Sequence, residues 1–176
     1  MPLLKNNAFV VDAWATLEDD APLPDGGKLI VSPARLSRDW DGLARFTGLL
    51  GVRLTNTDKV EALAPYISQI ALVVLPFPAF VDGRSYSLGH QLRLDGYRGE
   101  LRAEGNILPD QLQYMRQVGF DSFVVDNRFP LQLWQAAAKQ MSLAYQRGLF
   151  RVANETEVWS DRHQGFAPWE EQPHAG

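Results

Sequence analysis

The sequence predicts an α/β fold with a mostly parallel sheet of about five strand–helix units, either open or shaped like part of a barrel. Apolar runs of strand length alternate with segments of helical period along most of the chain. The units recur at spacings of about 20 to 30 residues, which suits parallel strands joined by right-handed crossovers. A closed (β/α) barrel needs eight units and about 250 residues. The 176 residues of this chain therefore favour an open sheet, or a partial barrel completed by a partner subunit.

Five segments are predicted to be strands, and an additional one precedes them. Residues 70–77, IALVVLPF, are the clearest, because an unbroken run rich in β-branched residues fits burial on both faces of a sheet. Residues 7–17, NAFVVDAWATL, fit an edge strand or one arm of a hairpin. The remaining predicted strands are residues 28–33, 52–56, 99–105 and 120–126.

A segment of helical character follows each of the five strands. Residues 130–148 open with a proline and are rich in alanine and leucine, which is typical of a helix. Pro65 is predicted to end or bend the helix at 58–69, because proline has no N–H to donate. The other predicted helices are residues 35–51, 87–97 and 106–119, with N-caps at Ser37, Asp58 and Asn106 and closing glycines at Gly96 and Gly119.

Charge and hydropathy exclude two classes of partner. The formal net charge is -4 and the 17 Lys and Arg residues are scattered, so the chain offers no basic field for nucleic acid. No apolar stretch approaches the roughly 20 residues that a membrane-spanning helix needs. We therefore expect a cytoplasmic protein that binds neither nucleic acid nor a membrane.

The chain contains no cysteine, which excludes disulfides, thiolate nucleophiles and cysteine-ligated metal clusters within it. Its three histidines, His90, His163 and His174, are far apart in sequence and show no metal-ligand spacing. We expect no metal site.

The polar segments after the predicted strands indicate where a site would lie. In a parallel α/β sheet these loops gather at one edge, where helix N-termini also converge. Arginine forks and backbone N–H groups at such an edge suit an oxyanion. The candidate anion-binding residues are Asp82, Arg84, Ser85, Asn106 and Arg128.

The cluster at 82–85 also has a purely structural interpretation. Asp82 and Gly83 fit a tight turn in which glycine takes positive φ, and Arg84 would then pair with Asp82. Glu100, Arg102 and Glu104 alternate with apolar residues, as on any half-exposed strand with a solvated or ion-paired face. Both interpretations remain open at this point.

Four ordered motifs carry a family resemblance. They are F-x-D-G-R-x-(Y/F)-S at 80–87, G-E-L-R-A-x-G at 99–105, D-Q-x-x-Y-(L/M) at 110–115 and G-F-D at 119–121. Together with LPDGGKLIVS at 23–32, they make the chain, to about residue 146, similar to bacterial domain-of-unknown-function family 934. The resemblance adds Gly83, Arg102, Asp110 and Gln111 as neighbours of the site. The first-turn position of Asp110 and Gln111 on a helix is an ordinary alternative for those two.

Members of that family are commonly labelled as probable oxidoreductases involved in sulfite reduction. The resemblance therefore implies sulfur assimilation, with sulfite reductase or its electron donor as a partner. The sequence departs from the family pattern at Gly89-His90, where an alanine–arginine pair is common, and at Gln117-Val118, where an arginine–cysteine pair is common. The second departure removes a thiol that redox chemistry could use.

The residues themselves give no cofactor. The chain has no G-x-G-x-x-G spacing, no phosphate-binding Walker loop and no cysteine ligands for iron–sulfur clusters. The cofactor is therefore unknown, and a flavin bound without a motif remains an open alternative.

Three hypotheses follow for residues 1–150, predicted as a single α/β domain, and for the aromatic-containing tail at 151–176. The first is an accessory protein of sulfite reduction, with Trp159, Phe166 and Trp169 of the tail anchored on a partner or folded back on the chain itself. The second is an anion- or phosphate-binding enzyme or sensor, in which Arg84 holds the anion and Asp82 orients Arg84 or acts as a base. The third is a flavin- or nicotinamide-dependent oxidoreductase. Catalytic residues, and whether the protein is an enzyme or a homo-oligomer, are not predicted.

Overall fold

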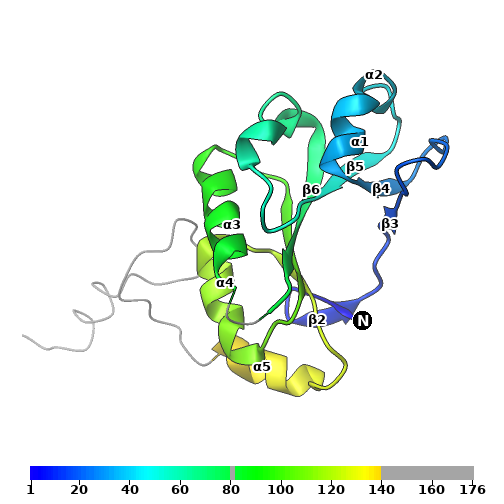
Figure 1. Cartoon of the computed structure of the whole chain (residues 1–176). Helices are drawn as coiled ribbons and strands as arrows, with labels where there is room; N and C mark the ends of the chain where they lie inside the picture. Colours follow the sequence, from blue (N-terminus) through cyan, green and yellow to red (C-terminus); the bar gives the residue numbers. More distant parts are fainter. Residues whose placement is uncertain (80–81, 140–176) are drawn as a thin grey trace, which may run out of the picture.

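The strands form one sheet of eight in a computed structural model that describes residues 1–79 and 82–139. Figure 1 shows the sheet with its helices gathered on one face. The strands are β1 Leu3–Lys5, β2 Ala8–Val10, β3 Ala15–Thr16, β4 Lys28–Val31, β5 Leu49–Arg53, β6 Ile70–Phe77, β7 Glu100–Gly105 and β8 Ser122–Val124.

Short helices connect these strands. The α-helices are α1 Pro33–Arg38, α2 Trp40–Leu43, α3 Arg84–Leu94, α4 Leu112–Val118 and α5 Leu131–Lys139. Three 3₁₀ helices, η1 Val60–Leu63, η2 Ile67–Gln69 and η3 Pro109–Gln111, complete the described elements.

The sheet is mixed, which corrects the prediction of a mostly parallel one. Its order is β2-β1-β8-β7-β6-β5-β4-β3, and strands β3 to β8 run parallel in the order of the sequence. Strand β1 pairs antiparallel with both β2 and β8. The β1–β2 hairpin turns through Asn6 and Asn7, which both have positive φ, the conformation that two-residue hairpin turns require and that asparagine tolerates. Residues 7–17 thus supply both a hairpin arm, β2, and an edge strand, β3.

The prediction of about five strand–helix units is not confirmed. Within the described chain, α-helices follow β4, β6, β7 and β8, but β5 is followed by η1 and η2. Pro65 lies between those two turns and cannot donate a helical hydrogen bond. The single helix predicted at 35–51 is also wrong, because it divides at Asp39 and its last residues belong to β5.

All three predicted N-caps are corrected as well. Asp58 does not cap a helix, because η1 has Lys59 at its N-cap position. Ser32, not Ser37, caps α1, and its Oγ accepts a hydrogen bond from the Arg35 N–H. Asn106 does not cap η3, which begins after Leu108.

The sheet is strongly curled, as the connection between its two edges requires. Only Val11–Trp14 join β2 at one edge to β3 at the other, and an extended chain covers at most about 18 Å in that step. A flat sheet of eight strands would separate its edges by about 34 Å. The edges must therefore bend toward each other, and Figure 1 shows the N-terminal segment crossing the open side.

Alternate residues of the central strands pack on opposite faces of the curled sheet. Val73, Leu75 and Phe77 of β6 lie in the main core beneath the helices. Leu72 and Val74 face the concave side, where they pack with Ile30 and Trp14. Strand β6 is thus buried on both faces, as predicted, and the concave side encloses buried groups of its own.

Helix α4 ends at Val118, and Gly119, which has positive φ, is its C-cap, as the sequence predicts. None of the helices within the described residues is long and apolar enough to cross a membrane.

Candidate functional site

Asp82 joins two loops at the carboxyl-end edge of the sheet. Its carboxylate accepts hydrogen bonds from Asn56 Nδ2 at 2.6 Å, from the loop after β5, and from Arg84 Nε at 2.9 Å and Nη2 at 2.6 Å. The Arg84 N–H also donates to Asp82 at 3.1 Å. These bonds hold the pKa of Asp82 far below its usual value, with the Arg84 side chain as the main cause. Asp82 is therefore suited to orient Arg84 and is a poor base.

Gly83 and Ser85 play structural parts beside this pair. Gly83 has a φ of -81°, so the expectation that it takes positive φ is wrong. The Ser85 side chain is 1% exposed, and its Oγ donates to the carbonyl of Pro76 at the end of β6. In this arrangement Ser85 fastens α3 to the sheet.

Asn106 connects the loop after β7 to the loop after β6. Its Nδ2 donates to the Pro78 carbonyl at 2.7 Å and its backbone N–H donates to the Phe77 carbonyl at 2.8 Å. Three neighbouring strand-end loops are thus linked in the order that their parallel strands dictate.

Arg128 repeats the pattern of Arg84 after β8. Its Nε and its backbone N–H both donate to Asp126, two residues earlier, at 2.6 Å and 2.8 Å. Its guanidinium carbon lies 5.5 Å from the centre of the Phe129 ring. Both strand-end arginines therefore have their charge met by an aspartate of their own Asp-x-Arg turn, and Arg128 contacts Asp126 and Phe129 of its own loop.

Asp110 and Gln111 belong to η3, at the start of the connection to α4. The Gln111 Oε1 accepts a hydrogen bond from the Leu108 N–H at 3.0 Å, and Asp110 is an exposed first-turn acid. Both positions match the ordinary helix-start reading. Asp110 also borders an apolar groove of about 480 Å³ against α5, lined by Leu108, Pro109, Phe129, Leu133, Ala136 and Ala137.

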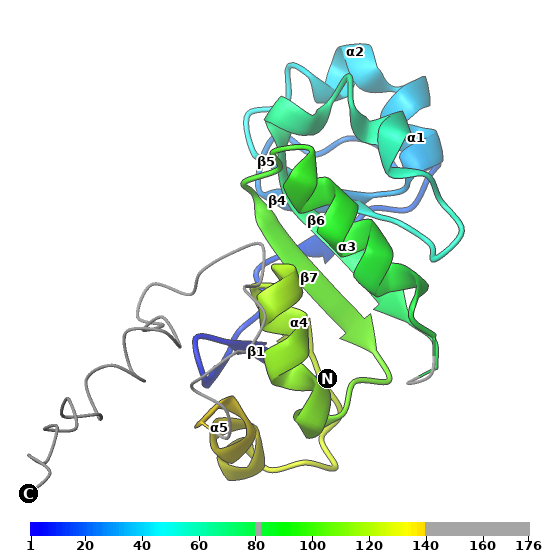
Figure 2. The same ribbon diagram turned by 90° about the vertical axis from the view of Figure 1, so that its left-hand side faces the viewer.

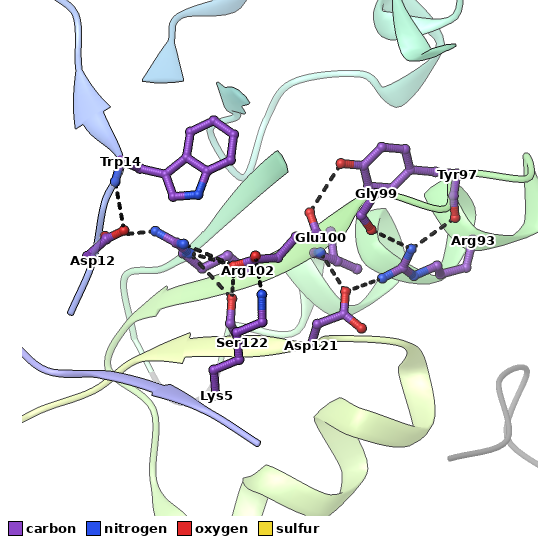
Figure 3. A network of polar contacts seen from close by, with 11 residues as sticks. Lys5, Asp12, Trp14, Arg93, Tyr97, Gly99, Glu100, Arg102, Asp121 and Ser122 are labelled. Carbon is purple, nitrogen blue, oxygen red and sulfur yellow. Dashed lines mark hydrogen bonds and ion pairs between the residues drawn. The ribbon is translucent and has the colours of Figure 1, made fainter. Parts of the chain in front are cut away.

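Arg102 is at the centre of a buried polar network on the concave face of the sheet. Figure 3 shows its guanidinium among side chains from its own strand, from β8 and from the segment before β3. It contacts Asp12 at 2.8 Å, Glu100 at 2.9 Å and Ser122 at 3.3 Å. Its side chain is only 2% exposed, so Arg102 is an interior group and not a neighbour in contact with Asp82.

Glu100 completes this network from the same strand. Its carboxylate accepts hydrogen bonds from Lys5 Nζ at 2.6 Å and from Ser122 Oγ at 2.6 Å. Burial acts to raise the pKa of Glu100, but the bonds from Lys5, Ser122 and Arg102 outweigh it and hold the pKa below the usual value. The charged face predicted for Glu100, Arg102 and Glu104 is thus an ion-paired one, and Glu104 pairs with Arg53 at 3.0 Å.

Lys5, Asp12 and Ser122 were not predicted as members of any site. Each comes from a different segment, and only the antiparallel placement of β1 beside β8 and the short β2–β3 connection bring them to Arg102. The one available signal was the E-L-R-A-E alternation itself. It places charged side chains on a strand whose neighbour, β6, is apolar on both faces.

Residues 1–79 and 82–139 contain no group of three His, Asp or Glu side chains that could hold a metal ion. The tail residues Trp159, Phe166 and Trp169 lie outside the described part of the chain.

Comparison with known proteins gives one family and one curated relative. The chain is 34% identical over 138 residues to a tRNA dimethylallyltransferase of Cereibacter sphaeroides, an alignment that covers 74% of this chain and 42% of that protein. The chain thus spans less than half the length of this relative. A family model described as "Bacterial protein of unknown function (DUF934)" matches residues 51–155, a range that begins within β5, extends past α5 and includes all of the predicted site residues. The chain therefore belongs to the DUF934 family of bacterial proteins of unknown function.

Proposed function

We propose that the protein is an accessory component of assimilatory sulfite reduction, acting in sulfur assimilation beside sulfite reductase or its electron donor. The observation that carries the proposal is the set of ordered motifs at residues 80–121, which lies within the matched family region and resembles proteins labelled for this pathway.

The geometry of the strand-end edge favours an accessory role over catalysis by the predicted residues. Asp82 and Asp126 are each bonded to the arginine two residues later, and Ser85 is buried against a backbone carbonyl. A general base needs a pKa near the working pH, whereas the pKa values of both aspartates are lowered. These groups are engaged in ion pairs and structural hydrogen bonds, which fits a binding role better than catalysis.

The alternatives have less support. An anion held by Arg84 would compete with Asp82 for the same guanidinium, which weakens the case for an anion site at this edge. A flavin- or nicotinamide-dependent activity has no motif in the sequence to support it. The tRNA-modifying activity named for the Cereibacter protein would favour a basic surface, and this chain has a net charge of -4.

A gene deletion in a bacterium that encodes the protein tests the proposal. The deletion strain should grow slowly with sulfate or sulfite as the sole sulfur source and normally with sulfide or cysteine. The full chain supplied in trans should restore growth. Equal growth of the deletion and parent strains on sulfite would overturn the proposal.

A second experiment separates an accessory role from direct catalysis. Sulfite reductase in the deletion extract should regain activity when the purified full chain is added, while the purified chain alone should not reduce sulfite. An immunoblot for sulfite reductase after capture of the tagged full chain tests the contact itself. Reduction of sulfite by the chain alone would assign it an enzymatic role instead.

A further inference from the structure

A cationic pocket lies at the opposite edge of the sheet, at the amino ends of β7 and β8. It has a volume of about 670 Å³ and lies among the β1–β2 turn, the residues before β7 and the residues before β8. Lys5, Arg93, Arg98 and Arg116 line it, against two carboxylates, Glu100 and Asp121. In a protein of net charge -4, this lining has an excess of two positive charges.

Arg93 builds the wall of this pocket. Its side chain is 6% exposed, and its guanidinium donates to the carbonyls of Tyr97, Gly99 and Gly119 at 2.8 to 3.0 Å. It also pairs at 2.6 Å with Asp121, whose carboxylate accepts the Leu101 N–H at 2.8 Å (Figure 3). These bonds of Arg93 hold the residues before β7 and the residues before β8 in place, and so preorganise the wall of the pocket.

Arg116 provides the observation that points to a ligand. It is half-buried, and its Nη2 donates to the neutral Asn7 side chain at 2.7 Å. Burial lowers the pKa of Arg116, with no carboxylate among the causes. The two carboxylates of the pocket are already bonded to Lys5 and Arg93. A bound anion would therefore stabilise Arg116 in a way that these carboxylates do not.

We propose that this pocket binds a small organic molecule with a doubly charged tetrahedral oxyanion, such as a phosphate monoester. The guanidinium groups of Arg116 and Arg98, which both line the pocket, have the planar fork of N–H donors that suits such an oxyanion. The volume lies within the range of small-molecule sites and exceeds what a free inorganic ion fills. The site does not depend on the role in sulfite reduction.

Calorimetric titration of the full chain tests the site, in a low-salt buffer free of phosphate and sulfate. The probes are phenyl phosphate, its neutral parent phenol, and inorganic phosphate. Phenyl phosphate should bind with a Kd below about 1 mM, phenol should give no binding heat, and inorganic phosphate should bind at least about tenfold more weakly. Binding should weaken at 0.15 M salt because the contact is ionic.

Matched variants locate the binding. Arg116→Gln keeps a donor for Asn7 but removes the charge, and should weaken phenyl phosphate binding at least about tenfold. Arg45→Gln makes the same charge change on an exposed residue two positions after α2, a helix at one end of the molecule in Figure 2. Arg45 does not line the pocket, so this variant should leave affinity within about twofold. Melting curves establish that each variant is folded.

Three results would overturn the proposal. One is no heat with the wild-type chain at 10 mM phenyl phosphate, a ceiling about tenfold above the expected Kd. The second is equal affinity for phenyl phosphate in Arg116→Gln and wild type. If Arg116→Gln does not fold, Arg98→Gln, on an exposed loop, replaces it. An unchanged affinity in Arg98→Gln would then overturn the proposal. Inorganic phosphate binding as tightly as the ester would remove the organic part of the assignment. The cell-growth outcome is independent of all three.

Discussion

Replacing Arg102 by methionine tests whether the concave network stabilises the fold. The substitution keeps an unbranched apolar side chain but removes the guanidinium from three partners. Breaking a buried pair by removing one partner costs about 3–5 kcal/mol. The lower end applies here, because Asp12 is 37% exposed and Glu100 keeps its bonds to Lys5 and Ser122. We therefore expect a loss of about 3 kcal/mol in the free energy of unfolding.

Urea unfolding at pH 7, followed by circular dichroism, measures this loss. For a chain of this size, about 3 kcal/mol corresponds to a fall of about 6–12 °C in Tm. The matched control is Arg45→Met, an exposed arginine whose replacement should change stability by no more than about 0.5 kcal/mol.

The dependence of the loss on pH identifies its cause. Arg102 is one of the groups that lower the pKa of Glu100, so that pKa should rise in the variant and the penalty should be smaller at pH 4 than at pH 7. In the wild-type chain the folded pKa of Glu100 is lowered, so its contribution is present above the unfolded pKa and is lost as pH falls through the folded value. A loss under about 1 kcal/mol at pH 7, or a loss that does not shrink at pH 4, would refute the reasoning.

Two other predictions concern the strand-end edge and the backbone. The pKa of Asp82 is lowered, so its stabilising bonds are present above the unfolded pKa and are lost only as pH falls through the lower folded value. In Arg84→Gln, NMR titration of the Asp82 carboxyl carbon should show this pKa rising toward its usual value. A titration midpoint equal to that of the wild type would contradict the assignment to Arg84. The second prediction concerns the backbone at Gly105, which has a φ of 122° and where an added Cβ would lie 2.4 Å from the Phe77 carbonyl oxygen. Gly105→Ala should therefore lower the free energy of unfolding, measured with urea, by more than about 1 kcal/mol. Gly42→Ala, on the open surface of α2, should instead be neutral or stabilise by up to about 1 kcal/mol, and similar losses in both variants would show that the backbone argument is wrong.

The parts of the fold with a local signal could be predicted from the sequence. The apolar run at 70–77 forms β6, because a strand that is buried on both faces has apolar residues at successive positions. The segment at 99–105 contains β7, and its alternation of charged and apolar residues is the pattern of a strand with two different faces. The break at Pro65 was likewise visible, since proline lacks a donor N–H.

Pairing between distant segments left no such trace. Nothing near Leu4 indicates that it pairs with Phe123, and the three-residue strands β1 and β2 are too short for periodicity to reveal. The sequence therefore could not predict that β1 pairs antiparallel with β8, nor the network around Arg102 that depends on this pairing.

The candidate site was predicted in part. The order of parallel strands correctly places the loops containing Asn56, Asp82 and Asn106 side by side. Residue type alone could not show that Arg84 and Arg128 are each paired within their own turns. It also could not show that Ser85 is committed to the Pro76 carbonyl, because such bonds depend on side-chain direction.

The pairing of β1 with β8 has a consequence for biosynthesis. The ribosome releases Leu3–Lys5 long before Ser122–Val124, so the first hairpin has no sheet to join until more than two thirds of the chain has emerged. The contacts of Lys5 and Asp12 with β7 wait for the same moment. Contacts so far apart in sequence form slowly. The nascent protein therefore carries an unpaired strand edge during synthesis, which makes this interval the one in which a chaperone would help most.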